Sequence, residues 1–421
     1  MRHSIDNMKP SAGSVAVAVA LLYACGYLPT RLYAAPGGGP SLIAHWRLDE
    51  SSGTMAKDSV GGNDGFVNGS LQWHPYGGRL DGTLEFGGVN EYIHCGDAGV
   101  FNLTAGITVS AWVNIGEVRY DWQAIVTKGD SAWRLSTAAR ERRFHFGVTG
   151  GPDYQAVDGN TTVRANEWRH VCGTYDGQYL RLYLDGEPDA AALPYTGGIG
   201  VNAFPVQIGA NAEQLNRRWK GLIDDVRVYN GALTAAEVRA LYREAPLYVD
   251  ADSPGGNGFT WSSAFKSLQD ALVVANWGCR IHVASGLYRP DDGGGWSRGD
   301  RIATFLLKSG VRVRGGYAGY GQPNPSARDV VLFETVLSGD LSGNDTVPAD
   351  PCEMFMDTLR SENSRHVVCA VMIADAVLDG FTVTAGHADG SDGAFPRVNN
   401  GAGLFCRDSR LTVSNCTFRH N

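Results

Sequence analysis

The sequence predicts an all-β protein, with an antiparallel β-sandwich in its first half and a right-handed parallel β-helix in its second. The first observation is the glycine content, 55 of 421 residues with no Gly-x-y period, which indicates many tight turns. The second is that apolar and polar residues alternate over short runs, the period of β-strands. The third is that only two segments carry a helical apolar pattern. Because this length exceeds one ordinary hydrophobic core, we expect two domains.

The first half is organised around a predicted β-hairpin at 168–186. Leu180, Leu182 and Leu184 alternate with polar or aromatic residues, so they share one face of a strand. The turn before them contains Gly177, and glycine takes positive φ without strain. Because a hairpin alone is marginal in water, the leucine face predicts a second sheet that covers it.

The rest of residues 41–245 supplies strands for such a sandwich. Short runs separated by Gly, Asn and Asp turns are predicted as strands at 44–48, 84–86, 91–94, 107–113, 124–128, 144–146, 206–209 and 222–229. Many short strands with no intervening helices indicate a sandwich or barrel. One helix follows, because Thr234 and Glu237 have capping-box spacing before an apolar stripe. Pro246 then breaks the helix and marks the predicted domain boundary.

Five spaced motifs in this half carry a family resemblance. They are HWRLDESSG at 45–53, TVSAWV at 108–113, WRHVCGTYDG at 168–177, LYLDG at 182–186 and GLIDDVRVY at 221–229. Together they resemble a laminin-G-like, concanavalin A-like jelly-roll domain of the bacterial secreted type. The resemblance implies two curved antiparallel sheets and, in many members, sugar or protein binding at the concave face or the rim loops.

The resemblance does not by itself imply catalysis. Hydrolases of this superfamily carry paired acids as Glu-x-Asp-x-x-Glu, a spacing that places carboxylates on one face of a strand. That motif is absent from the sequence, and Asp224 and Asp225 are adjacent, so they point to opposite faces. We therefore interpret the domain as non-catalytic.

A sugar-binding platform is predicted on the hairpin. Tyr179, Arg181 and Tyr183 share the strand face opposite the leucines, and Trp122 and Trp133 come from neighbouring segments. Aromatic rings offer stacking surfaces, and the guanidinium adds hydrogen-bond donors. The alternative is that these aromatic residues fill the core or pair across strands.

A structural calcium ion is the one cofactor that the sequence suggests. Calcium prefers several oxygen ligands, and Asp49, Asn63, Asp64 and Asp224 offer them from loops and one strand. The alternative is that Asp and Asn act here as ordinary turn formers.

The second half, residues 246–421, has the pattern of a right-handed parallel β-helix with a helical cap. An amphipathic helix is predicted at 262–276, and short strands broken by Gly, Asp and Asn follow. LQDAL at 268–272, VLSGDL at 336–341 and LDGFTV at 378–383 resemble secreted, pectate-lyase-like β-helix proteins of bacteria. GAGL at 401–404 and FRHN at 418–421 resemble polymorphic outer-membrane repeats. Because the sequence stops as a rung finishes, we expect the natural protein to continue beyond Asn421.

Acidic residues in this half raise the question of catalysis. β-Helix lyases and hydrolases use clustered acids, and Asp375, Asp379, Asp389 and Asp392 lie close in sequence, with His387 among them. The interpretation favoured here is that they occupy turns and a surface loop. The sequence has no phosphate-binding, dinucleotide-binding or zinc-binding spacing.

The N-terminus predicts export. Basic residues precede an apolar run too short to span a bilayer, and small residues surround Ala34 and Ala35, which indicates a signal peptide at 1–35. A second interpretation is a lipobox at 22–25, with a lipid anchor on Cys25. Either interpretation predicts a secreted or cell-surface protein without a transmembrane segment after signal removal.

Cysteine spacing and charge exclude several classes of site. The eight cysteines have no compact spacing, so we expect buried free thiols in place of a disulfide framework or a metal site. The net charge of −8 argues against binding to nucleic acid or to an anionic membrane.

These observations predict a non-enzymatic protein that recognises a polysaccharide or a cell-surface glycan or protein through the sandwich, with the β-helix as a stalk or a second binding face. One alternative is a polysaccharide lyase or glycoside hydrolase with a catalytic β-helix and a targeting sandwich. A second alternative is a structural surface protein.

Overall fold

The computed structural model describes residues 39–150, 153–346, 358–389 and 400–421. The predicted signal peptide with Cys25, and also Cys352 and Asp392, lie outside these residues. Within the described part of the chain, no helix is long and apolar enough to cross a lipid bilayer.

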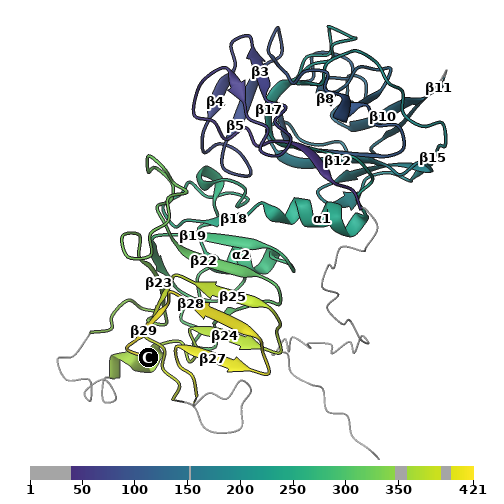
Figure 1. The fold of residues 1–421 in the computed structure, drawn as a ribbon. Helices are drawn as coiled ribbons and strands as arrows, with labels where there is room; N and C mark the ends of the chain where they lie inside the picture. Colours follow the sequence, from purple (N-terminus) through teal and green to yellow (C-terminus); the bar gives the residue numbers. More distant parts are fainter. Residues whose placement is uncertain (1–38, 151–152, 347–357, 390–399) are drawn as a thin grey trace, which may run out of the picture. The chain divides into compact units, whose positions relative to one another are not determined.

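Two antiparallel sheets, here called sheet A and sheet B, form the first half of the described chain (Figure 1). Sheet A contains β1 (Leu42–Trp46), β4 (Gln72–His74), β5 (Thr83–Gly87), β7 (Ile107–Ile115), β12 (Trp168–Tyr175), β13 (Tyr179–Leu184), β14 (Glu187–Pro188), β15 (Leu193–Pro194) and β17 (Lys220–Tyr229). Sheet B contains β2 (Met55–Ala56), β3 (Gly65–Asn68), β6 (Tyr92–His94), β8 (Ala124–Thr127), β9 (Trp133–Thr137), β10 (Phe144–Gly150), β11 (Asp153–Asp158) and β16 (Gln207–Ile208). A short 3-10 helix, η1 (Gly99–Phe101), lies between β6 and β7. The predicted antiparallel sandwich is therefore confirmed.

The hairpin β12–β13 forms as predicted. Tyr175 pairs with Leu180 across a turn in which Gly177 has a φ of +87°. The carboxylate of Asp176 accepts hydrogen bonds from the backbone N–H groups of Gln178 and Tyr179 at 2.8 and 2.7 Å, which closes the turn. The three leucines of β13 are buried in the core between the sheets.

A glycine sets how closely the two sheets approach. Gly173 pairs with Val109 on β7 and Leu182 on β13, and both of these partners belong to the core. A Cβ atom at Gly173 would lie closer to the ring of Phe146, on sheet B, than van der Waals contact allows. The missing side chain at Gly173 therefore gives the Phe146 ring its place between the sheets.

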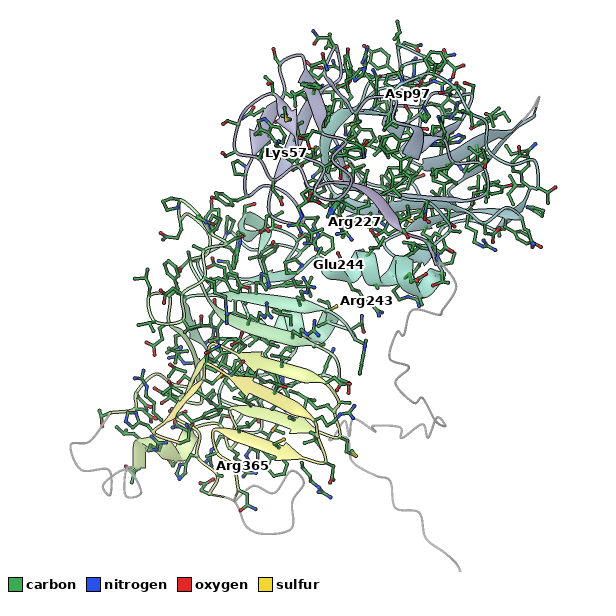
Figure 2. The ribbon with its side chains drawn as sticks, in the orientation of Figure 1. Lys57, Asp97, Arg227, Arg243, Glu244 and Arg365 are labelled. Atoms are coloured by element: carbon green, nitrogen blue, oxygen red, sulfur yellow. The ribbon has the colours of Figure 1, made fainter. Side chains whose placement is uncertain are left out.

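The predicted capping box begins helix α1 (Ala235–Glu244). The Thr234 hydroxyl accepts a hydrogen bond from the Glu237 N–H, and the Glu237 carboxylate accepts one from the Thr234 N–H. Val238 and Leu241 pack with Tyr183 on sheet A. At the end of the helix, Glu244 forms an ion pair of 2.7 Å with Arg227 on β17 (Figure 2). The capping box and this ion pair fix the helix against the outer face of sheet A.

Parallel strands make up the second half of the described chain. Sheet C contains β18 (Leu247–Val249), β19 (Arg280–Ala284), β22 (Arg312–Tyr317), β25 (Ala376–Asp379) and β28 (Leu411–Ser414). Sheet D contains β20 (Gly286–Tyr288), β23 (Thr335–Ser338), β26 (Thr382–Thr384) and β29 (Thr417–Arg419). Sheet E contains β21 (Phe305–Leu306), β24 (Val368–Val371) and β27 (Leu404–Arg407). Short helical segments at η2 (Trp261–Ser263), α2 (Leu268–Val274) and η4 (Thr358–Glu362) connect some of these strands.

Successive strands visit sheets C, D and E in turn, from β19 to β21, from β22 to β24 and from β25 to β27. Figure 1 shows the strands of sheet C as parallel arrows in one stack. Ile281, Val313 and Leu378 occupy the same register position on neighbouring strands, and all three are buried. The predicted parallel pairing is confirmed, while the right-handed β-helix remains a prediction.

The helix predicted at 262–276 is shorter than expected. The structure divides that segment into η2 and α2. Phe265 lies between them and forms a parallel bridge to Val249, and its backbone bonds to Tyr248 and Asp250. A new helix then begins at Ser267, whose hydroxyl accepts a hydrogen bond from the Asp270 N–H. The apolar stripe was predicted correctly, but strand pairing at Phe265 interrupts the helix.

Six cysteines lie in the described part of the chain, and each is a free thiol there. Cys95, Cys172 and Cys369 are buried, whereas Cys406 is exposed. Burial raises the pKa of the three buried thiols, so these thiols stay protonated at neutral pH.

The Gly173→Ala substitution should destabilise the sandwich, because the added methyl group would collide with Phe146 between the two sheets. Overpacking of this kind costs about 1–3 kcal/mol, so the midpoint of thermal unfolding should fall. The matched control is Gly99→Ala, at an exposed position where a Cβ would meet nothing within 4 Å. Equal unfolding midpoints for the two variants would contradict this description of the core.

Candidate functional site

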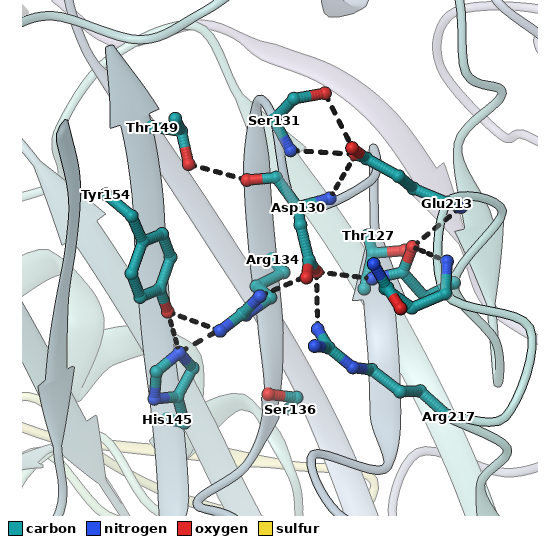
Figure 3. A network of polar contacts seen from close by, with 12 residues as sticks. Thr127, Asp130, Ser131, Arg134, Ser136, His145, Thr149, Tyr154, Glu213 and Arg217 are labelled. Atoms are coloured by element: carbon teal, nitrogen blue, oxygen red, sulfur yellow. Dashed lines mark hydrogen bonds and ion pairs between the residues drawn. The ribbon is translucent and has the colours of Figure 1, made fainter. Parts of the chain in front are cut away.

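The outer face of sheet B carries a network of polar side chains (Figure 3). On β9, Trp133 and Leu135 are buried in the core. Because successive side chains of a strand point to opposite faces, Arg134 lies on the other side of the sheet. The same alternation on β10 buries Phe144 and Phe146 and places His145 beside Arg134.

Asp130 lies at the centre of this network. One of its carboxylate oxygens receives Arg134 Nη1 at 2.6 Å, Arg217 Nη1 at 2.5 Å and Asn211 Nδ2 at 2.8 Å. The turn that carries Asp130 is itself held by Glu213, whose carboxylate accepts the backbone N–H groups of Asp130 and Ser131 at 2.8 and 2.9 Å. Both guanidinium groups are thus fixed by a carboxylate that cannot easily move.

Arg134 connects this carboxylate to an aromatic pair. Its guanidinium donates to Tyr154 Oη at 2.6 Å and to His145 Nε2 at 3.3 Å, and its Cζ lies 4.5 Å from the centre of the Tyr154 ring. A Cβ at Gly147 would overlap the Tyr154 side chain. Gly147 therefore leaves the space in which Tyr154 crosses from β11 towards Arg134.

The ionisation states favour hydrogen bonding over nucleophilic chemistry. Burial lowers the pKa of His145, and the charge of Arg134 lowers it further, so the imidazole is neutral at pH 7. Its Nδ1 lies 2.5 Å from a carboxylate oxygen of Asp158, and its Nε2 bonds to the Tyr154 hydroxyl. Burial raises the pKa of Tyr154, so the phenol stays protonated and is not an activated nucleophile.

Part of this network is open to solvent. Tyr154 is 39% exposed, and the side chain of Asp158 is 52% exposed. Trp122 is half-buried, with the guanidinium of Arg217 5.2 Å from its ring centre. Tyr154, Asp158, Arg217 and Trp122 are here called the Tyr154 face. Two partly exposed aromatic rings and an exposed carboxylate thus belong to one connected network, in which Arg217, whose side chain is 13% exposed, links Trp122 to Asp130.

The structure does not bring the five predicted sugar-binding residues together. Tyr179 is exposed on β13 with the guanidinium of Arg181 5.1 Å from its ring centre, and Arg181 bonds to Asp176. Tyr183 is packed with α1, and Trp133 lies in the sandwich core. Trp122 belongs to the Tyr154 face, beside sheet B. Of the five, three side chains reach solvent, at two separate places.

The four predicted calcium ligands fall into two pairs. Asp49 accepts the Gly82 N–H at 2.8 Å, and Asp224 accepts the Arg79 and Leu80 N–H groups at 2.7 and 2.9 Å. Asn63 and Asp64 instead bond to Asp58, at the turn after β2. No hydrogen bond or ion pair between described residues joins the two pairs. Adjacent Asp225 bonds to His45 and Arg227. The strict alternation that placed Asp224 and Asp225 on opposite faces does not hold here, because the pairing of β17 with β7 is irregular at this point and Ile223 and Val226 both enter the core.

Three of the four acidic residues predicted as a catalytic alternative lie in the described part of the chain, and each of these three is paired with an arginine. Asp379 accepts Arg328 at 2.8 Å, Asp375 accepts Arg410 at 3.2 Å and Asp389 accepts Arg301 at 2.8 Å. Asp379 also accepts hydrogen bonds from Ser414 and Asn415 on the next turn of chain. His387 Nδ1 lies 2.5 Å from the backbone oxygen of Arg360. These pairs support turns between neighbouring strands and do not converge on one site.

Sequence reasoning missed Arg134, His145, Tyr154 and Asp158. The alternation in WRLST at 133–137 and FHFGV at 144–148 carries the signal, because it places a charged residue and a titratable residue between buried apolar residues on neighbouring strands. The pairing of β9 with β10 and of β10 with β11, which brings these residues together, is not visible in either segment alone.

The Asp49→Asn substitution should flatten the fall of stability with rising pH. Burial raises the pKa of Asp49 from 3.8 to about 6, so the folded state holds this proton more tightly than the unfolded state. That contribution is fully present below pH 3.8 and is lost as pH rises through about 6. Thermal unfolding should be measured in chelator between pH 3.8 and about 6. Over this range, the midpoint temperature should decrease less for the variant than for the wild type. Identical pH profiles for the two proteins would refute this assignment.

Comparison with known proteins finds similarity within the first half of the chain. Residues 86–239 match the sequence profile of the Concanavalin A-like lectin/glucanases superfamily. A stretch of 165 residues, 37% of this chain, is 29% identical to Adhesion G-protein coupled receptor V1 of Danio rerio. The match spans only 3% of that receptor.

Two solved structures are also similar to part of the chain. One is domain 4 of AbnA, an extracellular GH43 arabinanase of Geobacillus stearothermophilus in complex with arabinotriose, at 20% identity and a TM-score of 0.39, covering 48% of this chain and 98% of that one. The other is the binding domain of Paraclostridial Mosquitocidal Protein 1, at 18% identity and a TM-score of 0.42, covering 53% and 55%. With the antiparallel sheets A and B and the matching sequence profile, residues 86–239 are a concanavalin A-like jelly-roll domain.

Proposed function

We propose that this chain is an exported, non-enzymatic binding protein whose jelly-roll domain recognises a carbohydrate at the Tyr154 face. The observation that carries the proposal is that two partly exposed aromatic rings, Tyr154 and Trp122, each contact one of the two arginines that Asp130 holds in place. The matching superfamily includes lectins by its description, which supports the same conclusion.

The chemistry of the face suits a sugar ring. A pyranose or furanose offers apolar C–H groups that pack against an aromatic face, and hydroxyl groups that bond to charged partners. Tyr154 and Trp122 provide the rings, while Asp158 and Arg217 provide an acceptor and a donor. Because Asp130 already holds Arg134 and Arg217 in position, binding would cost little additional side-chain entropy.

A binding role accounts for this face better than a catalytic one. Hydrolysis of a glycosidic bond ordinarily requires two carboxyl groups facing each other across the sugar. Beside the Tyr154 face, the Asp130 carboxylate already forms ion pairs with two guanidinium groups, and the Asp158 carboxylate is bonded to His145. The protonated phenol of Tyr154 gives no nucleophile there.

We further propose that the parallel sheets C, D and E form a right-handed β-helix that acts as a stalk or a second binding face. The regular rotation of strands through the three sheets supports this proposal. The N-terminal signal pattern at 1–35 supports export to the cell surface or the medium, and a polysaccharide or a surface glycan is then the partner. The structural calcium proposed for Asp49, Asn63, Asp64 and Asp224 is separate from this face.

The Tyr154→Ala substitution should weaken sugar binding roughly tenfold or more, since losing an aromatic anchor at a binding surface costs about 2 kcal/mol. The measurement is binding of the full chain to a glycan array, in calcium and again in chelator, followed by titration with the oligosaccharide that binds. The matched control is Tyr179→Ala, which removes the exposed tyrosine of β13 and should leave binding unchanged. Loss of binding only in the Tyr179 variant, or no glycan binding by the wild type, would refute the proposal.

The Gly147→Ala substitution should reduce sugar binding nearly as much as loss of the Tyr154 ring, because the new methyl group would displace that ring. Its effect on unfolding should be smaller than that of Gly173→Ala, since position 147 lies on the outer face of sheet B. Far-UV circular dichroism would verify the fold, and Gly99→Ala again provides the control. Full sugar affinity in the Gly147 variant would mean that the position of Tyr154 does not matter.

A further inference from the structure

The outer face of sheet C carries arginine side chains on two neighbouring strands. Ile281 on β19 and Val313 on β22 belong to the apolar core of the second half. Because successive side chains of a strand point to opposite faces of the sheet, the residues that flank them point outward. Arg280 is one of these, and it pairs in register with Arg312 on the next strand. Two guanidinium groups thus project from strands that lie about 4.8 Å apart.

Arg280 and Arg312 have no partner of opposite charge. Neither side chain forms an ion pair or a hydrogen bond with any residue in the described part of the chain. Arg312 is exposed, and Arg280 is half-buried. Like charges directly opposite each other on neighbouring strands are destabilising, and no contact among the described residues offsets this repulsion. An anion bound across the pair would replace the repulsion with charge-assisted hydrogen bonds.

A third arginine extends the positive charge along β22. Arg314 also points outward, and its Nε is shielded from solvent and lacks a hydrogen-bond partner. Asp379 Oδ2 lies 3.8 Å from that nitrogen, which is too far for a hydrogen bond. The Asp379 carboxylate bonds instead to Arg328 at 2.8 Å and to two polar side chains on the next turn of chain. Arg314 therefore keeps an N–H donor without an acceptor among the described residues.

His282 shows that these charges act together. It pairs in register with Arg314, and its ring stacks on that of Tyr317 at a centroid distance of 4.4 Å. The pKa of His282 falls to about 3, first because burial disfavours the charged ring and then because three arginines lie near it, Arg314, Arg280 and Arg328. The imidazole is therefore neutral at pH 7, and the guanidinium groups determine the charge of this face.

The row beyond Arg312 is uncharged and open to solvent. Val377 on β25 pairs with Arg312, and Thr412 on β28 pairs with Val377. Val377 is half-buried, and Thr412 is exposed. These small side chains form a strip across the strands of sheet C. A linear molecule can lie along this strip with anionic groups at Arg280 and Arg312.

We propose that the outer face of sheet C binds an acidic polysaccharide through Arg280, Arg312 and Arg314. A planar guanidinium group matches the paired oxygens of a carboxylate or a sulfate. A polymer that carries such anions at regular intervals fits arginines that repeat on successive strands. The proposal gives the second binding face a ligand class, and it rests on the proposed function only in taking a glycan as the partner.

Nucleic acid is the other common polyanion, and the charge of the protein argues against it. The chain has 44 acidic residues against 36 basic ones, a net charge of −8. Duplex DNA carries about one charge per 1.7 Å of its axis, so the acidic remainder of the protein would repel it. A single glycan chain is narrower and can contact the arginines alone.

The test is isothermal titration of the full chain at low salt with three polymers: polygalacturonate, dextran sulfate and uncharged dextran. The wild type should bind one or both acidic polymers and not dextran. Its affinity should fall as salt is added, because salt screens exposed charges. The acidic polymer that binds more tightly identifies carboxylate or sulfate as the anion.

Replacing both unpaired arginines, as Arg280→Gln with Arg312→Gln, should weaken binding at least about tenfold, because two charge-assisted hydrogen bonds are lost. The unfolding midpoint of this variant should stay the same or rise, because the repulsion between the two strands is removed. The matched control is Lys266→Gln with Arg298→Gln, which removes two exposed positive charges elsewhere in the second half. This control should bind as the wild type does.

The Val377→Glu substitution tests the same face without removing an arginine. The new carboxylate would lie opposite Arg312 in register and pair with it, so binding should fall by a similar factor. This variant decides alone if the double arginine variant does not fold by circular dichroism.

Four results would overturn the acidic-polysaccharide site. The first is a wild type that binds neither acidic polymer at low salt. The second is wild-type affinity in both the double arginine variant and Val377→Glu. The third is an equal loss in the double arginine variant and its control, which would mean that net charge alone drives binding. The fourth is binding of duplex DNA at least as tight as that of the acidic polymers.

This site and the Tyr154 face can fail separately. Tyr154→Ala keeps all the arginines of sheet C, so it should bind the acidic polymer as the wild type does. Loss of that binding in Tyr154→Ala, with full binding in the double arginine variant, would place the acidic polymer at the Tyr154 face and contradict the proposal.

Discussion

The burial of two apolar sheet faces against each other is the constraint on which the jelly-roll domain depends. Gly173 on sheet A gives the ring of Phe146 on sheet B its place between them, and the leucines of β13 complete the same core. Because successive side chains of a strand point to opposite faces of the sheet, each residue that points into this core has a neighbour in sequence on the outer face. The chemistry of the outer surface is thus determined jointly with the packing of the core.

On β9 and β10 of sheet B, some of these outer-face side chains are charged or polar, and they need hydrogen-bond partners. Arg134 and His145 lie between buried apolar residues, and they contact Asp130, Tyr154 and Asp158 on the outer face. The desolvation of largely buried ion pairs can cancel their attraction, so this network is better understood as a means of holding Tyr154 and Arg217 in one position. A preformed surface of this kind loses less entropy when it binds a ligand.

Local signals in the sequence were sufficient for some elements and insufficient for others. The hairpin β12–β13 and the capping box of α1 were predicted because their residues are adjacent in sequence. The helix at 262–276 was predicted too long, because Phe265 pairs with a strand whose residues lie outside that segment. Tyr183 was expected at the surface, but α1 covers it. The Tyr154 face depends on the pairing of β9, β10 and β11, whose residues no single segment brings together.

The central claim is that the outer face of sheet B, and not the edge of β13, receives the sugar. The most direct measurement is a crystal structure of the full chain soaked with the oligosaccharide that binds most tightly on the array. The account predicts density for a sugar ring over Tyr154 or Trp122, with hydroxyl groups within hydrogen-bond distance of Asp158 or Arg217. Sugar density at Tyr179 and Arg181, or at the parallel sheets alone, would contradict it.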